Sequence, residues 1–137
     1  MPRYVLVADY TLMTEYRGVP LATFFSCIPA DEWYSRLLFR ILADPPRLDP
    51  HGRPLRAPYG LRKVEAALVG AVGRDDVVIA DPRTVERWID GDAEVVGIHA
   101  MDPLGLGPVR LSFTMGGTMT PYTKAMFREL MGRVRRP

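Results

Sequence analysis

The chain has 137 residues, of which 47% are apolar and 25% charged, a composition that predicts one globular domain over residues 1–137 and excludes a disordered chain. Its 18 basic and 16 acidic side chains leave a net charge of +2, which gives no reason to expect binding to nucleic acid. Because no apolar run approaches the ~20 residues of a membrane span or the pattern of a signal peptide, we expect a cytoplasmic protein without membrane contact.

Three short apolar segments rich in β-branched residues predict strands. They span residues 4–8, 77–80 and 95–101, and each is followed by an aspartate. Such runs are typical of strands that are buried on both faces of a parallel sheet. Proline follows two of the three aspartates and cannot continue a central strand. With helical segments between them, the strands indicate parallel βαβ units.

Helical spacing of apolar residues predicts helices over residues 58–71, 82–89 and 121–134. We expect Gly73 to end the first of them. The last one follows Thr120, a good N-cap residue, and has Pro121 at its first position. Between the third strand and this last helix we expect only a loop.

The stretch from residue 10 to residue 56 is far longer than the usual βα loop of two to six residues, and we predict an insertion that packs. Within it, residues 22–28 are apolar, and residues 31–42 predict a helix. Four apolar residues of this helix share one face: Trp33, Leu37, Leu38 and Ile41. Five prolines within residues 43–58 predict an extended return to the domain.

These elements predict an α/β fold of the Rossmann-like, flavodoxin type, with a mostly parallel sheet in three αβα layers and a partly helical insertion after the first strand. A doubly wound sheet would continue beyond the last helix into a fourth strand, so the fold is expected to be incomplete at its C-terminus. The open edge of the sheet would need a cover. We therefore expect the chain to be the front part of a longer protein, or a second chain to cover the edge.

Ligands of open parallel sheets bind beyond the carboxyl ends of the strands, so candidate residues follow each strand. The segment of residues 101–109 is the strongest candidate. Its glycines, Gly105 and Gly107, either allow the backbone to approach a ligand or only build turns. A GxGxxG fingerprint would need glycine where Arg110 stands, and no P-loop pattern occurs, which excludes both nucleotide-binding motifs.

No residue stands in a clear metal-binding or nucleophilic pattern. His99, inside the third strand, is more simply a hydrogen-bonded core residue than a ligand. Asp49 and His51 match the start of the cobalt-binding pattern DxHxxG, but Pro54 takes the glycine position, so we interpret this segment as a turn. Cys27, the single cysteine, cannot form an intrachain disulfide and is expected to be a small buried hydrophobe. We predict no catalytic residue and no metal ligand.

Three segments resemble one family: TLM at residues 11–13, APYGLRKVEAAL at 57–68 and VVGIHAMDPLGLGP at 95–108. Together they are similar to the N-terminal part of radical S-adenosylmethionine (radical SAM) proteins that carry a cobalamin-binding domain, in the branch with a long insertion after the first strand. The resemblance covers essentially the whole chain. It implies a Rossmann-like domain that holds cobalamin over the carboxyl ends of the strands and is not an enzyme by itself.

In that family a downstream barrel carries CxxxCxxC, whose thiolates bind a [4Fe-4S] cluster that cleaves S-adenosylmethionine. This chain has no such motif, so both cofactors are expected only in a missing downstream radical SAM domain. The strand and Gly-Gly-Pro turn that usually follow the last helix are missing as well. The absence of DxHxxG does not count against cobalamin, since many similar domains lack the histidine ligand.

Carried over by position, the resemblance places ten residues around the corrin: Asp9, Tyr10, Pro58, Tyr59, Gly60, Met101, Asp102, Leu104, Gly105 and Gly107. Two other functions stay open. One is an interaction or scaffold α/β domain that has lost ligand binding. The other is a nucleotide-binding Rossmann-like module.

Overall fold

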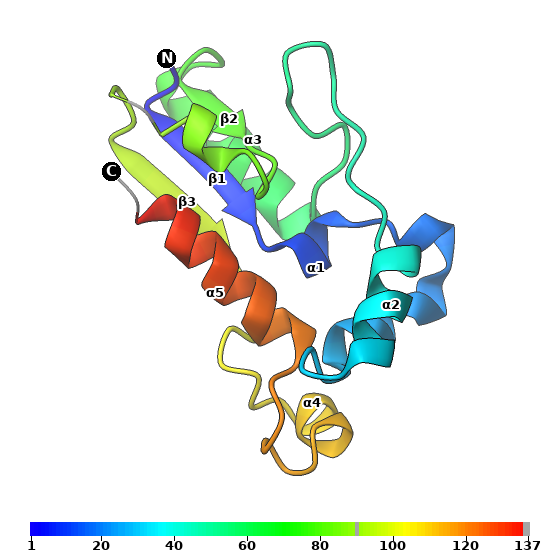
Figure 1. The fold of residues 1–137 in the computed structure, drawn as a ribbon. Coiled ribbons are helices and arrows are strands. Elements are labelled where there is room, and N and C mark those ends of the chain that lie inside the picture. The colour runs from blue at the N-terminus through cyan, green and yellow to red at the C-terminus, as the bar shows by residue number, and fades with distance from the viewer. Residues whose placement is uncertain (90, 136–137) are drawn as a thin grey trace.

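A three-stranded, all-parallel sheet forms the centre of the computed structural model, which describes residues 1–89 and 91–135. The strands are β1 (Tyr4–Ala8), β2 (Val77–Ile79) and β3 (Val95–His99), in the order β2-β1-β3 (Figure 1). Val5 of β1 is in register with Val78 of β2 and with Val96 of β3. The predicted α/β class with a parallel, open sheet is confirmed.

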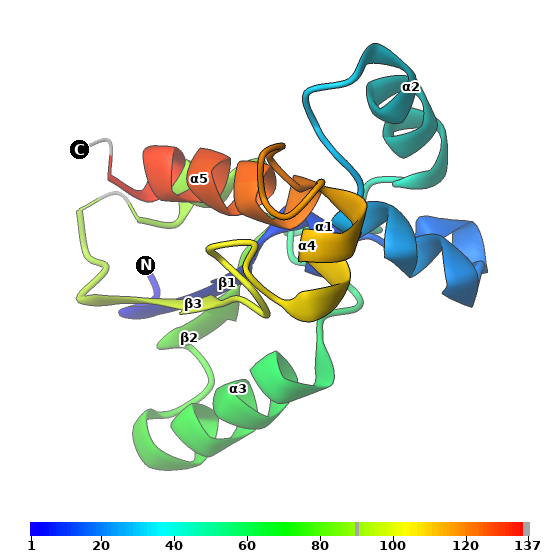
Figure 2. The ribbon, with the colours of Figure 1, turned by 90° about the horizontal axis from the view of Figure 1, so that it is seen from below.

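Helices cover both faces of the sheet and give three layers (Figure 2). Successive residues of a strand point to opposite faces, so β1 supplies both cores. On one face, α3 (Tyr59–Val72) packs with a buried cluster that includes Leu6, Ala8, Leu61 and Ile79. On the other face, α5 (Tyr122–Val134) packs with a cluster that includes Val5, Val7, Val78 and Leu130.

The two long helices lie within a residue or two of their predicted bounds. Gly73, at φ +100°, ends α3 as expected, because glycine adopts this backbone conformation without strain from a Cβ atom. Pro121 rather than Thr120 occupies the N-cap position of α5. Leu130 of α5 is fully buried against the sheet, as its place on the predicted apolar face required.

Two predictions about the connections were wrong. Residues 82–89 do not form an α-helix but only a short 3-10 helix, η3 (Val85–Arg87). The reason is that the backbone directly after Asp81 forms a turn that is hydrogen bonded to Asp81 itself. The Asp81 side chain accepts a hydrogen bond from the Arg83 amide, and its carbonyl accepts one from the Thr84 amide, both at 3.0 Å. The expected loop before α5 contains a further helix, α4 (Pro108–Phe113), which starts with proline in its first turn.

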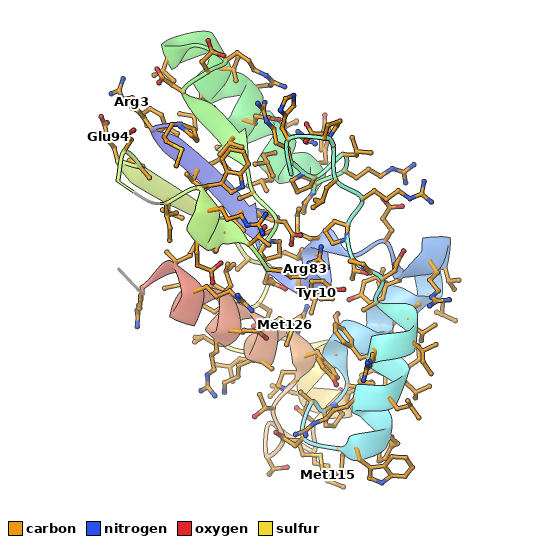
Figure 3. The ribbon with its side chains drawn as sticks, turned by 45° about the horizontal axis from the view of Figure 1, so that its top comes forward. Arg3, Tyr10, Arg83, Glu94, Met115 and Met126 are labelled. Atoms are coloured by element: carbon orange, nitrogen blue, oxygen red, sulfur yellow. The ribbon has the colours of Figure 1, made fainter. Side chains whose placement is uncertain are left out.

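The third strand also departs from expectation. It ends at His99 rather than at residue 101, and its residues are only half-buried or exposed. The interpretation of β3 as a strand buried on both faces is therefore wrong. β3 is an edge strand, and no further strand lies on its outer side within the described residues. β2 is the other edge strand but stays buried, because α3 packs on it and residues 53–55 of the insertion lie beside it. At the exposed start of β3, Glu94 forms an ion pair at 2.8 Å with Arg3, the residue directly before β1 (Figure 3).

Within residues 10–56, residues 10–43 lie beyond the carboxyl ends of the strands, whereas residues 49–55 of the return run back beside α3 and β2 (Figures 1 and 2). Together, residues 10–56 form the helices α1 (Tyr10–Met13) and α2 (Trp33–Leu42), the 3-10 helices η1 (Tyr16–Gly18) and η2 (Pro20–Cys27), and an extended return. Their core is a third buried cluster, in which the ring of Phe39 stacks on Tyr122 of α5 at 4.0 Å. The insertion is therefore held in place through the start of α5.

The α2 helix forms as predicted, but the apolar face that the sequence analysis expected to be buried is exposed. Trp33 is 74% exposed, and Leu37, Leu38 and Ile41 are exposed as well. The buried residues of the helix are Ser35 and Phe39. The reason is that apolar side chains occupy two sides of this helix, and the domain covers only one of them.

Candidate functional site

The carboxyl ends of β1 and β3 open into a cavity of about 420 Å³ that the insertion helps to enclose. Its wall comes from α1, η2 and the β3–α4 segment, and it mixes apolar side chains with hydroxyls. The lining residues are Thr11, Leu12, Thr14, Tyr16, Thr23, Phe24, Ser26, Cys27, Met101, Val109 and Arg110. We call this space the carboxyl-edge cavity. Its position is where ligands of open parallel sheets bind.

Asp9 is buried and hydrogen bonded to Thr11, a residue of the cavity wall. Its carboxylate caps α1, since it accepts hydrogen bonds from the Thr11 amide, at 2.9 Å, and from the Thr11 hydroxyl. Burial raises the pKa of Asp9 above the ordinary aspartate value, against the lowering effect of these hydrogen bonds. Asp9 therefore fixes the start of α1 and with it Thr11 of the cavity wall.

Arg110 is the charged group of the cavity wall, and it is buried at the start of α4. Its Nε donates a hydrogen bond to the Thr123 hydroxyl at 2.9 Å and lies 3.5 Å from an Asp102 carboxylate oxygen. One arginine thus joins α4, α5 and the loop after β3. Its neighbour Met101 contacts it through sulfur, 3.8 Å from Nη2.

The loop of residues 102–107 is closed by its own aspartate. The two carboxylate oxygens of Asp102 accept hydrogen bonds from the amides of Leu106, at 3.1 Å, and Gly107, at 2.8 Å. A Cβ atom at Gly107 would lie 2.9 Å from Asp102, and one at Gly105, where φ is +70°, would lie 2.6 Å from the Pro121 ring. The structure therefore favours the interpretation that Gly105 and Gly107 build a turn over the interpretation that they let the backbone approach a ligand.

Tyr10 lies in a second, smaller cavity of about 190 Å³ beside α5. Figure 3 shows Tyr10 together with Arg83 and Met126 near the ends of the strands. The Tyr10 hydroxyl donates a hydrogen bond to the Ala43 carbonyl at 2.8 Å. The Arg83 guanidinium is paired with the buried Asp81 carboxylate, whose hydrogen bonds raise the pKa of the arginine. The other arginine of the lining, Arg133, is paired with Glu86 and Glu129, so both cations of this cavity already have acidic partners.

Residues 58–60 open α3 on the opposite face of the sheet and are outside the lining of either cavity. The Tyr59 ring is exposed and lies 4.8 Å from the Lys63 ammonium. Gly60 faces the ring of His99, which a Cβ atom would meet at 3.3 Å. His99 is thus a half-buried residue packed on the start of α3 rather than a core residue.

The predicted site residues are therefore not brought together at one place. Met101 lines the carboxyl-edge cavity, and Leu104 is exposed beside it in the same loop. Thr11 lies in the TLM segment that carries the resemblance, whereas the cavity residues of η2 were not predicted as site residues, above all Phe24, Ser26 and Cys27. Their only signal was the length of the insertion after the first strand. Cys27 is buried, as expected.

No family model, curated protein or solved structure matches this chain. Within residues 1–89 and 91–135, no three histidine, cysteine or acidic side chains gather in a way that would bind a metal ion. In the same described residues, none of the helices has the length and apolar character needed to cross a membrane.

Proposed function

We propose that this chain is a cobalamin-binding domain that performs no chemistry by itself and serves a radical SAM domain. The observation that carries the proposal is the carboxyl-edge cavity with the apolar segment beside it. Three large apolar side chains of the loop after β3 are exposed there: Met101, Leu104 and Leu106. Contiguous exposed apolar surface of this kind is typical of binding sites.

The chemistry of the cavity matches the surface of a corrin. A corrin has broad apolar faces and a rim of amide side chains, so it needs apolar contacts together with hydrogen-bonding groups. Met101, Val109 and Phe24 supply apolar surface, and the hydroxyls of Thr11 and Thr23 are hydrogen-bonding groups of the same wall. The rest of a ligand larger than the cavity would lie over the exposed loop.

Cobalt ligation has no place in this proposal. Neither histidine lines the carboxyl-edge cavity, and the Asp49–His51 segment forms a turn in which Asp49 accepts the His51 and Arg53 amides at 2.8 Å. The protein would hold the corrin through its faces and rim alone. The [4Fe-4S] cluster and S-adenosylmethionine belong to the proposed downstream domain, because Cys27 is the single cysteine of the chain and is buried.

Binding of hydroxocobalamin tests the proposal. The purified chain at about 100 µM is mixed with an excess of the corrin, free ligand is removed by gel filtration, and the visible spectrum of the protein fraction is recorded. We expect corrin absorbance in that fraction at a 1:1 ratio. Absorbance confined to the free-ligand fraction would refute the cofactor assignment.

A matched pair of variants locates the site. Val109 is 45% exposed and lines the cavity, whereas Val64 is 48% exposed on the outer side of α3. Val109→Glu places a charge against the corrin and is expected to abolish retention. Val64→Glu makes the same chemical change elsewhere and should leave retention unchanged. Equal retention by both variants would place the ligand outside this cavity.

An interaction or scaffold domain is the second candidate, favoured by the open edge of β3 and by the exposed apolar face of α2. It predicts no corrin binding but a stable dimer or complex, which light scattering measures; a well-folded monomer would count against it. The nucleotide-binding alternative gains less support. The amides of Leu106 and Gly107, which such a loop would offer to a phosphate, already donate to Asp102.

A further inference from the structure

Arg110, the charged group in the wall of the carboxyl-edge cavity, has hydrogen-bond donors that the protein does not use. A guanidinium donates from Nε and from both Nη atoms. Within the described residues, Nε donates to the Thr123 hydroxyl at 2.9 Å, and Nη2 has only the Met101 sulfur, at 3.8 Å. Nη1 has no hydrogen-bond partner among these residues. Most of the donor capacity of this arginine is therefore left for a ligand.

The Nη end of the guanidinium is open to the cavity. In the described part of the chain, Ser35 Oγ is the only buried side-chain nitrogen or oxygen without a hydrogen-bond partner. Because Nη1 also has no partner, it must keep some contact with solvent. Nη2 lies against Met101, which lines the cavity as Arg110 does, whereas Nε points to Thr123, which does not. The Arg110 side chain is 11% exposed, so a ligand in the cavity can accept from Nη1.

The charges around Arg110 favour an uncharged acceptor over an anion. The Asp102 carboxylate lies 3.5 Å from Nε. Asp9 is a second neighbouring carboxyl group, since burial raises its pKa and the charge of Arg110 acts in the opposite direction. Two acidic groups thus already balance one guanidinium, and a further anion would gain no net attraction. The donors of Nη1 still need an acceptor.

The hydroxyl groups of the cavity wall have the opposite need. The Thr11 hydroxyl donates to Asp9, and the Thr23 hydroxyl donates to the Pro20 carbonyl at 2.8 Å. Their protons are used within the protein, but the lone pairs of their oxygens can still accept. Of the two residues, Thr23 is exposed. The cavity therefore offers a ligand a donor at Arg110 and an acceptor at Thr23, among apolar side chains.

A primary carboxamide combines both groups, since its carbonyl oxygen accepts and its NH₂ group donates. We propose that the carboxyl-edge cavity recognises a primary carboxamide of its ligand: Arg110 Nη1 donates to the carbonyl oxygen, and the Thr23 hydroxyl oxygen accepts from the amide nitrogen. A carboxylate lacks the N–H donors and adds a negative charge. The inference rests on the proposed function for the identity of the ligand, because a corrin carries such amides on its rim; recognition of the amide itself does not need a corrin.

Two small molecules test amide recognition without a corrin. The probes are 3-phenylpropionamide and 3-phenylpropionate, which differ only in the amide and carboxylate groups. Each is titrated at millimolar concentration into the ¹⁵N-labelled full chain at about pH 7. We expect saturable shifts of the Thr23, Met101 and Arg110 amide signals with the amide, and an affinity on the order of tenfold lower for the carboxylate. Equal affinities, tighter binding of the carboxylate, or no saturable shift would overturn the proposal.

Matched variants assign the two contacts. Thr23→Val removes the hydroxyl and should weaken amide binding by about two- to twelvefold, the usual effect of one hydrogen bond. Thr118→Val is the control and should bind as the parent chain does, because Thr118 is also exposed and donates to a backbone carbonyl, that of Met115 at 3.1 Å, but lies outside the cavity lining. Equal affinity in Thr23→Val and Thr118→Val would contradict the proposed acceptor.

Arg110→Lys keeps a positive charge beside Asp102 but has no Nη atoms. In this variant the preference for the amide over the carboxylate should disappear, while circular dichroism shows that the chain is folded. A general loss of packing would lower both affinities alike and leave their ratio unchanged. An amide preference that survives in folded Arg110→Lys would rule out Arg110 as the donor and overturn the proposal.

Hydroxocobalamin separates this inference from the proposed function. We expect Thr23→Val and Arg110→Lys to weaken its binding and Thr118→Val to leave it unchanged. If the corrin is not retained but the amide preference holds, amide recognition stands and the cobalamin assignment fails. If the parent chain, Thr23→Val and Arg110→Lys all bind the corrin equally, cobalamin binding stands and the amide inference is refuted.

Discussion

The same leucine-to-alanine change on two helices is expected to have very different effects on stability. Leu130 of α5 is 2% exposed and packs against the sheet, whereas Leu37 of α2 is 52% exposed. At Leu130 the change removes three buried carbons, worth about 2.4 kcal/mol at about 0.8 kcal/mol each, and the cavity left behind raises the loss to about 3–4 kcal/mol. At Leu37 no closed cavity forms, and the higher helix propensity of alanine offsets part of the loss, so we expect about 1 kcal/mol or less.

Urea unfolding followed by circular dichroism measures both values. Leu130→Ala should shift the midpoint strongly to lower urea while the slope m stays that of the parent chain, because the surface exposed on unfolding barely changes. Leu37→Ala should unfold close to the parent midpoint. A loss below about 1 kcal/mol at Leu130 would refute the packing of α5 on the sheet, and an equal loss at both positions would refute the outward orientation of the α2 face.

Three further predictions concern the residues that build the site. Burial raises the pKa of Asp9, so the folded state binds the carboxyl proton more tightly than the unfolded state. The contribution of this proton to the free energy of unfolding is complete below the ordinary pKa of 3.8 and is lost as the pH rises through the raised pKa. Asp9→Asn keeps an acceptor for the Thr11 amide but does not titrate. In urea titrations, the free energy of unfolding of this variant relative to the parent chain should therefore grow from about pH 3.5 to pH 7. A free-energy difference that shrinks as the pH rises would contradict this prediction. Gly105→Ala combines a left-handed backbone with a clash at Pro121 and should cost about 2–3 kcal/mol, whereas Gly70→Ala, with open space in the last turn of α3, should stabilise by about 0.5 kcal/mol. Thermal melts that rank the pair in the opposite order would count against the loop geometry. Arg110→Met removes the ion pair with Asp102 and is expected to cost about 2–4 kcal/mol in urea unfolding, so an unchanged midpoint would show that Arg110 does not join α4 and α5.

Local sequence patterns were sufficient to predict the strands of the sheet and the two long helices that pack on it. The β-branched runs before Asp9 and Asp81 predicted β1 and β2, and apolar spacing predicted α3 and α5 to within two residues. These signals are local, because a strand or an amphipathic helix repeats its buried positions every two or every three to four residues. The parallel arrangement was predicted from helices between the strands, and it is correct although only a short 3-10 helix, η3, forms between β2 and β3. The fold class was therefore accessible without coordinates.

Burial and side-chain partners depended on the tertiary structure. Apolar residues on two sides of α2 did not reveal which side the domain covers, and the packing of Phe39 on Tyr122 decided it. The glycines after β3 were equally compatible with a ligand or a turn until Asp102 was seen to accept the loop amides. The carboxyl-edge cavity and the smaller cavity at Tyr10 are built from residues far apart along the chain. The sequence by itself determined which segments fold into strands and helices, because that choice depends on near neighbours; the cavities depend on distant segments that meet only in three dimensions.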